Sequence, residues 1–379
     1  MPSGNLSHCY ISKIDPHISA VIASMVRETT NKKLYKSTVD DDLFDDACDL
    51  GQFFLNPMWY LYLKANNLFQ TSQQNQRNLR NIQSKAPTKH SSWIHLQQPL
   101  YFTFLTIGWG VVFIRVYPLI RASEHLSNIH VTNGYLVFAA CLLSWKFASS
   151  ASPGNITPST MQKFDNYPYD GILYEENSTC PTLNQRKLAR SKYDRFTQKH
   201  VPRFDHFCGW LRQPIGEENY RHFLMFVAVH ALMCGYGCLI IASIIQDSGK
   251  ETTPDDEKTA FGSKLRIHAS LSMIMCFLGL VAVTLLSFFG FHMYLISRGM
   301  TTNEYYKWKL ITSRHEAAKA RYLKSLNRDV RKDDEEDQSF TSVNDPGSFP
   351  ANIYDQGLIN NFLEILYPRS LFGSQDKDK

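Results

Sequence analysis

The sequence predicts an all-α integral membrane protein with four transmembrane helices and a large loop between the second and the third. Two observations carry this prediction. Four long apolar runs alternate with polar stretches, and the basic residues between the runs are gathered in one loop. A soluble fold would have to bury two helices of more than about 20 residues each, which ordinary helix lengths disfavour.

The apolar runs cover residues 101–120, 134–150, 222–245 and 268–296. A helix needs about 20 predominantly apolar residues to cross a bilayer, and the third and fourth runs meet that length. The first run carries Arg115 and Pro118 near its end, where an arginine side chain can extend to the membrane interface. The second run reaches full length only with flanking residues. We therefore expect helices 1 and 2 within residues 96–150 and helices 3 and 4 within residues 222–297.

The loops differ sharply in positive charge. The loop 151–221 holds ten Lys and Arg residues, whereas the loop 121–133 holds one. Because basic loops stay on the cytosolic side of a membrane, this asymmetry predicts that the loop 151–221, the tail 298–379 and both termini are cytosolic. Residues 1–95 form a further cytosolic region whose structure the sequence does not reveal.

One short motif in the large loop carries chemistry. The stretch VPRFDHFCGW, residues 201–210, places Asp205, His206 and Cys208 within four positions. An ordinary thiol is only a few per cent ionised at neutral pH, and a neighbouring imidazole can accept its proton. A carboxylate can hold that imidazole in the required tautomer. The three residues supply a nucleophile, a base and an orienting acid, although the residues alone also allow an ordinary thiol beside a solvated His–Asp pair.

The residues around this motif extend it in both directions. Those in register with a known family are Trp210, Asn219, Tyr220, Thr301, Thr302, Glu304, Asn352 and Tyr354. The stretch ARSK at 189–192 also fits. With four spans, this pattern resembles the DHHC protein S-acyltransferases, or palmitoyltransferases, and most closely a fungal branch of the endoplasmic reticulum. The resemblance covers roughly residues 100–367.

The chain departs from that family at the metal ligands. In the family, six Cys and two His hold two zinc ions. The eight matching positions here are Cys180, Leu183, Tyr193, Asp194, Thr197, His200, Phe207 and Pro214. Cys180 alone keeps the family residue, while Asp194 and His200 are weak candidates because their side chains can bind metals. We therefore expect zinc to be absent or substoichiometric, and we expect Leu183, Tyr193, Phe207 and Pro214 to form a small apolar cluster in its place.

The resemblance implies a protein S-palmitoyltransferase. Cys208 would take a long-chain acyl group from palmitoyl-CoA, with His206 as the base and Asp205 as its orienter. The acyl group would pass to cytosolic juxtamembrane cysteines of membrane-anchored proteins. The resemblance also implies the endoplasmic reticulum membrane as the location, with the Golgi as alternative, the lipid bilayer as surroundings and no nucleic-acid partner. We interpret most of the basic run 186–195 as marking the cytosolic side.

Two other functions stay open at this point. The first is a catalytically impaired member of the same family that acts as a membrane scaffold or adaptor. The second is a multipass transporter, which needs ionisable residues that face a pathway within the spans. Those residues are few and mostly near span ends: Arg115, Lys146, His222, His230, His268 and His292. Their scarcity disfavours transport.

Overall fold

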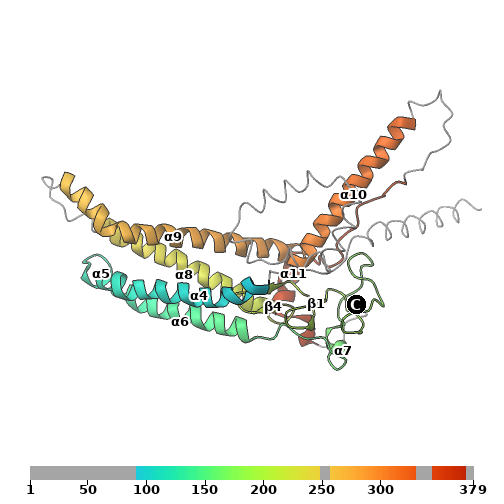
Figure 1. Ribbon diagram of the computed structural model, residues 1–379, viewed down its shortest axis with the longest axis horizontal. Coiled ribbons are helices and arrows are strands. Elements are labelled where there is room, and N and C mark those ends of the chain that lie inside the picture. Colours follow the sequence, from blue (N-terminus) through green and yellow to red (C-terminus); the bar gives the residue numbers. More distant parts are fainter. Residues whose placement is uncertain (1–90, 248–256, 330–343, 373–379) are drawn as a thin grey trace, which may run out of the picture.

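The structure is a computed structural model that describes residues 91–247, 257–329 and 344–372. The N-terminal region that the sequence leaves uninterpreted therefore lies almost entirely outside the described residues. Within them, long helices dominate and strands are short (Figure 1). The prediction of an all-α membrane fold is confirmed.

Among the described residues, four helices are long and apolar enough to cross a membrane, and they confirm the four predicted spans. The first span, Leu96–Ala122, combines α4 (Ser91–Val111), a π-helical turn η2 (Val112–Val116) and α5 (Tyr117–Ala122). The π turn stands directly before Pro118, whose missing N–H interrupts regular α-helical bonding. The span can therefore continue past the proline to Ala122.

The other spans are single helices. They are α6 (Ile129–Ser150), α8 (Tyr220–Asp247) and α9 (Glu257–Ser297), of which Ala269–Ser297 is the membrane-spanning part. The second span is completed by flanking residues 129–133, as its short apolar run requires. The helix α8 packs against both α6 and α9 (Figure 1).

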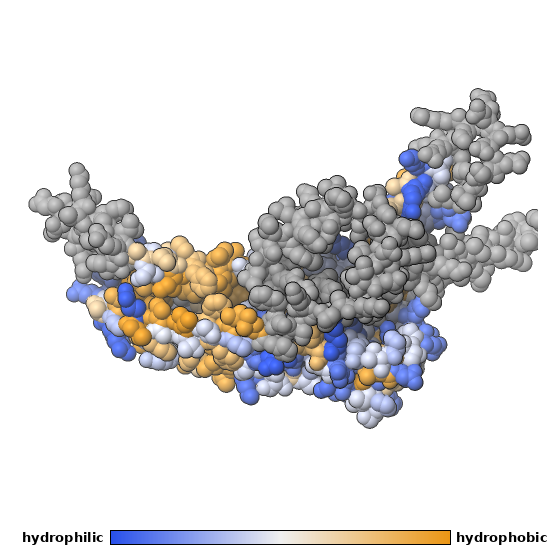
Figure 2. Space-filling model, viewed as in Figure 1, coloured by the Kyte–Doolittle hydropathy of each residue, from blue (hydrophilic) through white to orange (hydrophobic). Residues whose placement is uncertain are grey.

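Large apolar side chains point outward from the spans. Five of them are between 64% and 72% exposed: Leu136, Leu232, Leu239, Met273 and Leu280. Figure 2 shows this apolar surface over the helices and a hydrophilic surface over the loop at one end. Such outward-facing side chains are expected where the surrounding solvent is lipid.

The loop between α6 and α8 contains little regular structure. It begins with the short helix α7 (Met161–Phe164) and continues into two antiparallel hairpins. Strand β1 (Lys192–Asp194) pairs with β2 (Lys199–Val201), and β3 (His206–Cys208) pairs with β4 (Gln213–Ile215). These hairpins gather at one end of the helical bundle (Figure 1).

The C-terminal part returns to the same end of the bundle. After α9 the chain forms α10 (Thr302–Asp329), which projects away from the body, then α11 (Leu358–Leu366) and a 3₁₀ turn η4 (Arg369–Leu371) (Figure 1). A buried cluster joins the loop to this part; its members are Tyr167, Leu173, Tyr174, Ala189, Trp308, Ile311 and Tyr354. Apolar burial therefore ties together segments that are far apart in sequence.

Candidate active site

The hairpin β3–β4 explains the spacing of the Asp-His-x-Cys motif. His206 and Cys208 are the first and last residues of β3, and side chains two positions apart lie on the same face of a strand. Phe207 between them points the other way, opposite Pro214. Asp205 immediately precedes the strand, and its backbone N–H donates to Ile215 at 2.8 Å. The structure thus brings the three predicted residues together.

Asp205 and His206 form a buried pair. The imidazole Nδ1 donates to the Asp205 carboxylate at 2.6 Å, and both side chains are about 1% exposed. Because Nδ1 is held by the carboxylate, Nε2 is the nitrogen left for the thiol. The Cys208 thiol is near enough to the His206 imidazole to help raise its pKa. The arrangement can therefore transfer a proton between thiol and imidazole.

The two partners shift each other's pKa. Burial alone would raise the pKa of Asp205, but the His206 hydrogen bond and charge and the N–H of Thr302 lower it to about 2. Burial alone would lower the pKa of His206, but the hydrogen bond to Asp205 and the nearby Cys208 thiol raise it to about 9. At neutral pH these shifts favour an ionised Asp205 carboxylate beside a protonated His206 imidazole. His206 reaches this protonated state when it takes the proton of the Cys208 thiol.

The start of α10 holds Asp205 from the opposite side. The Thr302 backbone N–H donates to Oδ1 at 2.7 Å, and its hydroxyl donates to Oδ2 at 2.9 Å. Unpaired N–H groups at a helix N-terminus favour a negative charge. Asp205 thus accepts three hydrogen bonds, which fix the carboxylate that orients His206.

The rest of the Thr-Thr-x-Glu sequence caps the same helix. The Glu304 backbone N–H donates to the Thr301 hydroxyl at 3.2 Å, and the Thr301 backbone N–H donates to the Glu304 carboxylate at 2.9 Å. This reciprocal pair is a capping box, which fixes where a helix begins. Thr301 and Glu304 therefore set the position from which Thr302 reaches Asp205.

Arg190 of the ARSK stretch binds the other side of Glu304. Its guanidinium donates to both Glu304 oxygens, at 2.7 and 2.6 Å, and to the Gly299 carbonyl at 2.9 Å. It also lies 4.6 Å from the centre of the Tyr354 ring. Arg190 is about 1% exposed and Lys192 is also buried, so these two members of the basic run belong to the interior of the loop. A bidentate carboxylate partner accounts for the burial of the guanidinium.

The remaining predicted motif residues support backbone turns around the site. The Asn219 side chain accepts from Gly216 N at 2.8 Å and donates to Pro214 O at 3.0 Å, which joins β4 to the start of α8. Asn352 donates to Arg298 O at 2.8 Å, and the Tyr354 hydroxyl donates to Pro168 O at 2.9 Å. These bonds hold the C-terminal part against the loop and the end of α9.

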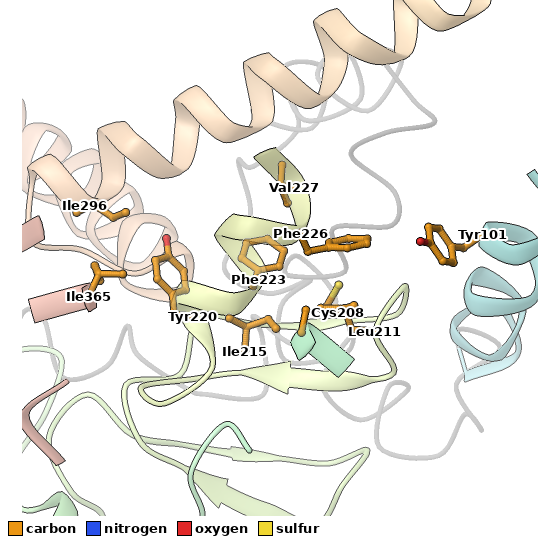
Figure 3. Close-up of a cluster of buried hydrophobic side chains, with 11 residues drawn as sticks. Tyr101, Cys208, Leu211, Ile215, Tyr220, Phe223, Phe226, Val227, Ile296 and Ile365 are labelled. Atoms are coloured by element: carbon orange, nitrogen blue, oxygen red, sulfur yellow. The ribbon is translucent and has the colours of Figure 1, made fainter. Parts of the chain in front are cut away.

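Trp210 and Tyr220 belong to the apolar cluster around the thiol. Its buried members are Tyr101, Ala148, Cys208, Leu211, Ile215, Tyr220, Phe223, Phe226, Val227, Ile296 and Ile365, and Trp210 packs against them. Figure 3 shows Cys208 and Leu211 close to Phe226, with Tyr101 facing them from α4. A long acyl chain on this sulfur would begin in apolar surroundings, so the site suits a hydrophobic thioester.

The sequence analysis missed three residues of this region. Glu364 lies 3.4 Å from Arg190 and 3.3 Å from Arg203, and Asn361 donates to Ser297 O at 3.2 Å. His292 of α9 lies beside His206. The one signal in the sequence is that Glu364 is the single acidic residue of the apolar stretch LINNFLEIL, and nothing in the sequence links Glu364 to Arg190 or Arg203.

The positions of the family's zinc ligands do not fit a zinc site. Asp194 accepts hydrogen bonds from the Thr197 N–H at 2.9 Å and from its hydroxyl at 2.5 Å, so this carboxylate closes the β1–β2 turn. His200 pairs with Tyr193 across that hairpin, and Cys180 is buried in a separate turn that its carbonyl closes with Asn184. Among the described residues, no three His, Cys, Asp or Glu side chains converge as metal ligands.

The predicted apolar cluster at these positions is wrong. Leu183 is 39% exposed, and none of the four residues belongs to a buried apolar cluster of the described part of the chain. Phe207 contacts Phe196 instead, with ring centres 4.5 Å apart. Hydrogen bonds in the β1–β2 turn and a ring contact between the two hairpins therefore occupy the places of the metal bridges, rather than one shared cluster.

The fold and the site define a multi-pass membrane protein with a cysteine, a histidine and an aspartate arranged for thiol chemistry next to an apolar region. The family described as DHHC palmitoyltransferase matches residues 173–309. The chain is 26% identical to palmitoyltransferase SWF1 of Yarrowia lipolytica, over 72% of this chain and 79% of that protein. It is 27% identical to mouse palmitoyltransferase ZDHHC4, over 60% of this chain and 71% of that protein. It is 24% identical to palmitoyltransferase swf1 of Schizosaccharomyces pombe, over 71% of this chain and 75% of that protein. Residues 173–309 thus match the DHHC palmitoyltransferase family, and the chain is similar over about 70% of its length to the fungal SWF1 proteins.

Proposed function

We propose that the chain is a protein S-palmitoyltransferase that carries a long-chain acyl group on Cys208. The observation that carries the proposal is the continuous arrangement from Thr302 through Asp205 and His206 to Cys208, beside the apolar cluster. Cysteine suits this role because exchange between two thioesters is nearly balanced in energy, so the acyl group can be taken up and passed on.

The reaction has two steps with the same geometry. In the first, the Cys208 thiolate attacks the carbonyl carbon of acyl-CoA, the bond to the CoA sulfur breaks, and His206 returns its proton to the departing CoA thiolate. In the second, His206 takes the proton of a substrate cysteine, whose sulfur attacks the acyl-Cys208 thioester and releases Cys208. Asp205 holds the imidazole in place in both steps.

The substrates in this proposal are membrane-anchored proteins with cysteines close to the membrane on the cytosolic side. The basic loop 151–221 supports a cytosolic position for the site, and with it cytosolic termini. The similarity to the SWF1 proteins fits the endoplasmic reticulum membrane, with the Golgi as the alternative. Palmitoyl-CoA is the donor in this proposal, and zinc is absent or substoichiometric.

The two other functions receive less support. The match to the DHHC family disfavours a transporter. A scaffold without catalysis would have no use for the three hydrogen bonds that fix the Asp205 carboxylate against His206.

The experiment is acylation of the purified protein by labelled palmitoyl-CoA. We expect wild type to take up one hydroxylamine-sensitive label and Cys208→Ser to take up none. Cys180→Ser is the matched control, because Cys180 is a second free and buried thiol of the same loop. Loading of His206→Ala should fall about 10²–10⁴-fold, the usual contribution of general-base help. Equal labelling of wild type and Cys208→Ser, or no labelling of either, would refute catalysis at Cys208.

A further inference from the structure

A second histidine lies next to the Asp205–His206 pair. His292 comes from α9, near the end of the fourth span, and is fully buried. Its ring centre is 6.1 Å from that of His206, and Phe223 lies 5.0 Å from each of the two rings. The sequence analysis counted His292 only as an ionisable group within a span.

One nitrogen of His292 has a partner and the other has none. Nδ1 forms a hydrogen bond of 2.8 Å with the hydroxyl of Tyr220, the first residue of α8. Nε2 is buried and makes no hydrogen bond within the described part of the chain. A buried polar atom without a partner is costly, and such atoms in native proteins call for an explanation. Ring packing alone would be satisfied by phenylalanine.

His292 is an electrostatic neighbour of both members of the pair. It lies within electrostatic range of both Asp205 and His206. The groups that face it are Asp205 and His206 from the loop and Tyr220 from α8; the Arg203 guanidinium lies 5.7 Å from the Tyr220 ring on the loop side. Phe288 on its own helix contributes ring contact without a charge.

We propose that His292, held by Tyr220, is a positioning residue for the Asp205–His206 pair. The Tyr220 hydrogen bond fixes the His292 imidazole, which packs against the His206 ring and helps to hold that ring in the orientation that accepts the proton of Cys208. The inference rests on the proposed function for its role in turnover. Its effect on the reactivity of the thiol can be measured without any acyl transfer.

The test is the rate at which iodoacetamide alkylates Cys208 in the purified full-length protein, quantified by mass spectrometry of the Cys208 peptide across pH. In His292→Phe, we expect the rate at neutral pH to fall about tenfold, a size typical of one lost hydrogen-bonding group. The pH of half-maximal alkylation should move upward, because a His206 ring that is held less firmly stabilises the Cys208 thiolate less. Tyr220→Phe should shift the profile in the same direction by a smaller amount.

Three further variants separate positioning from packing. Asparagine places a polar atom near Nδ1, the atom that bonds Tyr220, whereas glutamine places one near Nε2, so His292→Asn should retain more reactivity than His292→Gln. Phe288→Leu removes a ring contact to His292 and should leave the pH profile unchanged. The proposal is refuted if His292→Phe and Tyr220→Phe both keep the wild-type profile, or if every variant lowers the rate equally at all pH values, as a purely structural defect would.

The alkylation result is independent of the proposed function. If palmitoyl-CoA does not label wild type while the His292 variants still shift the alkylation profile, the acyltransferase proposal fails and the positioning role stands. If palmitoyl-CoA labels Cys208 and the profile does not depend on His292, the positioning role fails and the acyltransferase proposal stands.

Discussion

The ion pair between Arg190 and Glu304 offers the sharpest test of how the site is held. Both side chains are about 1% exposed, and two hydrogen bonds of 2.7 and 2.6 Å join them. Glu304→Gln keeps acceptor and donor atoms of nearly the same shape but removes the negative charge. The variant leaves the Arg190 guanidinium buried with Glu364 as its remaining carboxylate, at 3.4 Å.

Breaking a buried ion pair from one side costs about 3–5 kcal/mol, because an uncompensated charge stays in the interior. Because Glu364 still pairs with Arg190, the loss of stability in Glu304→Gln should lie at the lower end of this range, about 3 kcal/mol. At 1.4 kcal/mol for each factor of ten, the loop around residues 186–205 should open about 100-fold more often. Loading of Cys208 should also fall, since the capping box that positions Thr302 includes Glu304.

Hydrogen exchange of the loop peptides, followed by mass spectrometry, measures this opening directly. The matched control is Glu218→Gln, which makes the same chemical change in the Lys163–Glu218 pair, where the side chains are 44% and 23% exposed. An exposed pair contributes about 0–1 kcal/mol, so the control should exchange almost as wild type does. The reasoning is wrong if the loop of Glu304→Gln is protected as well as that of Glu218→Gln.

Three other predictions concern the hydrogen bonds, the charges and the metal. Thr302→Val removes the hydroxyl bond to Asp205 but keeps the backbone bond, so the loading rate should fall about tenfold, and an unchanged rate would contradict the role of that hydroxyl. Protonated His206 stabilises the fold fully below its ordinary pKa of 6.5, and this stabilisation is lost as the pH rises through its pKa in the fold, about 9. Ionised Asp205 stabilises the fold fully above its ordinary pKa of 3.8, and this stabilisation is lost as the pH falls through its pKa in the fold, about 2. The thermal stability advantage of wild type over His206→Gln should therefore shrink between pH 7 and pH 10, and a constant difference would count against the shift. Elemental analysis should find well under two zinc ions per chain, and chelation should leave Cys208 loading unchanged; a content near two would show that the assignment of ligand positions is wrong.

The spans and the reacting residues could be predicted from local sequence. An apolar run long enough to cross a bilayer is visible in the sequence itself. The third and fourth spans therefore begin and end within two residues of the runs 222–245 and 268–296. Asp205, His206 and Cys208 are neighbours in the chain, and strand geometry brings the last two to one face without any distant contact. A motif of this kind is readable because the backbone alone assembles it.

The partners of those residues could not be predicted, because long-range pairing decides them. Arg190 and Glu304 are 114 positions apart, and Tyr220 and His292 are 72 apart. An arginine in a basic run has the same local signature whether it faces water or a buried carboxylate. Leu183 shows the opposite case. Its apolar side chain predicted burial, but it lies in the turn at 180–184 and is exposed.

The distant pairings also fix the order in which the protein can mature. Asp205 meets Thr302 across 97 positions, and Arg190 meets Glu364 across 174. On a ribosome, the loop emerges while the fourth span and everything after it are still unmade, so the nascent Cys208 has its histidine but lacks the groups that fix Asp205. A chain interrupted before residue 358 would insert all four spans and still leave two buried arginines without Glu364. The partners of Asp205 and of the two arginines are therefore complete only once residue 364 has been made.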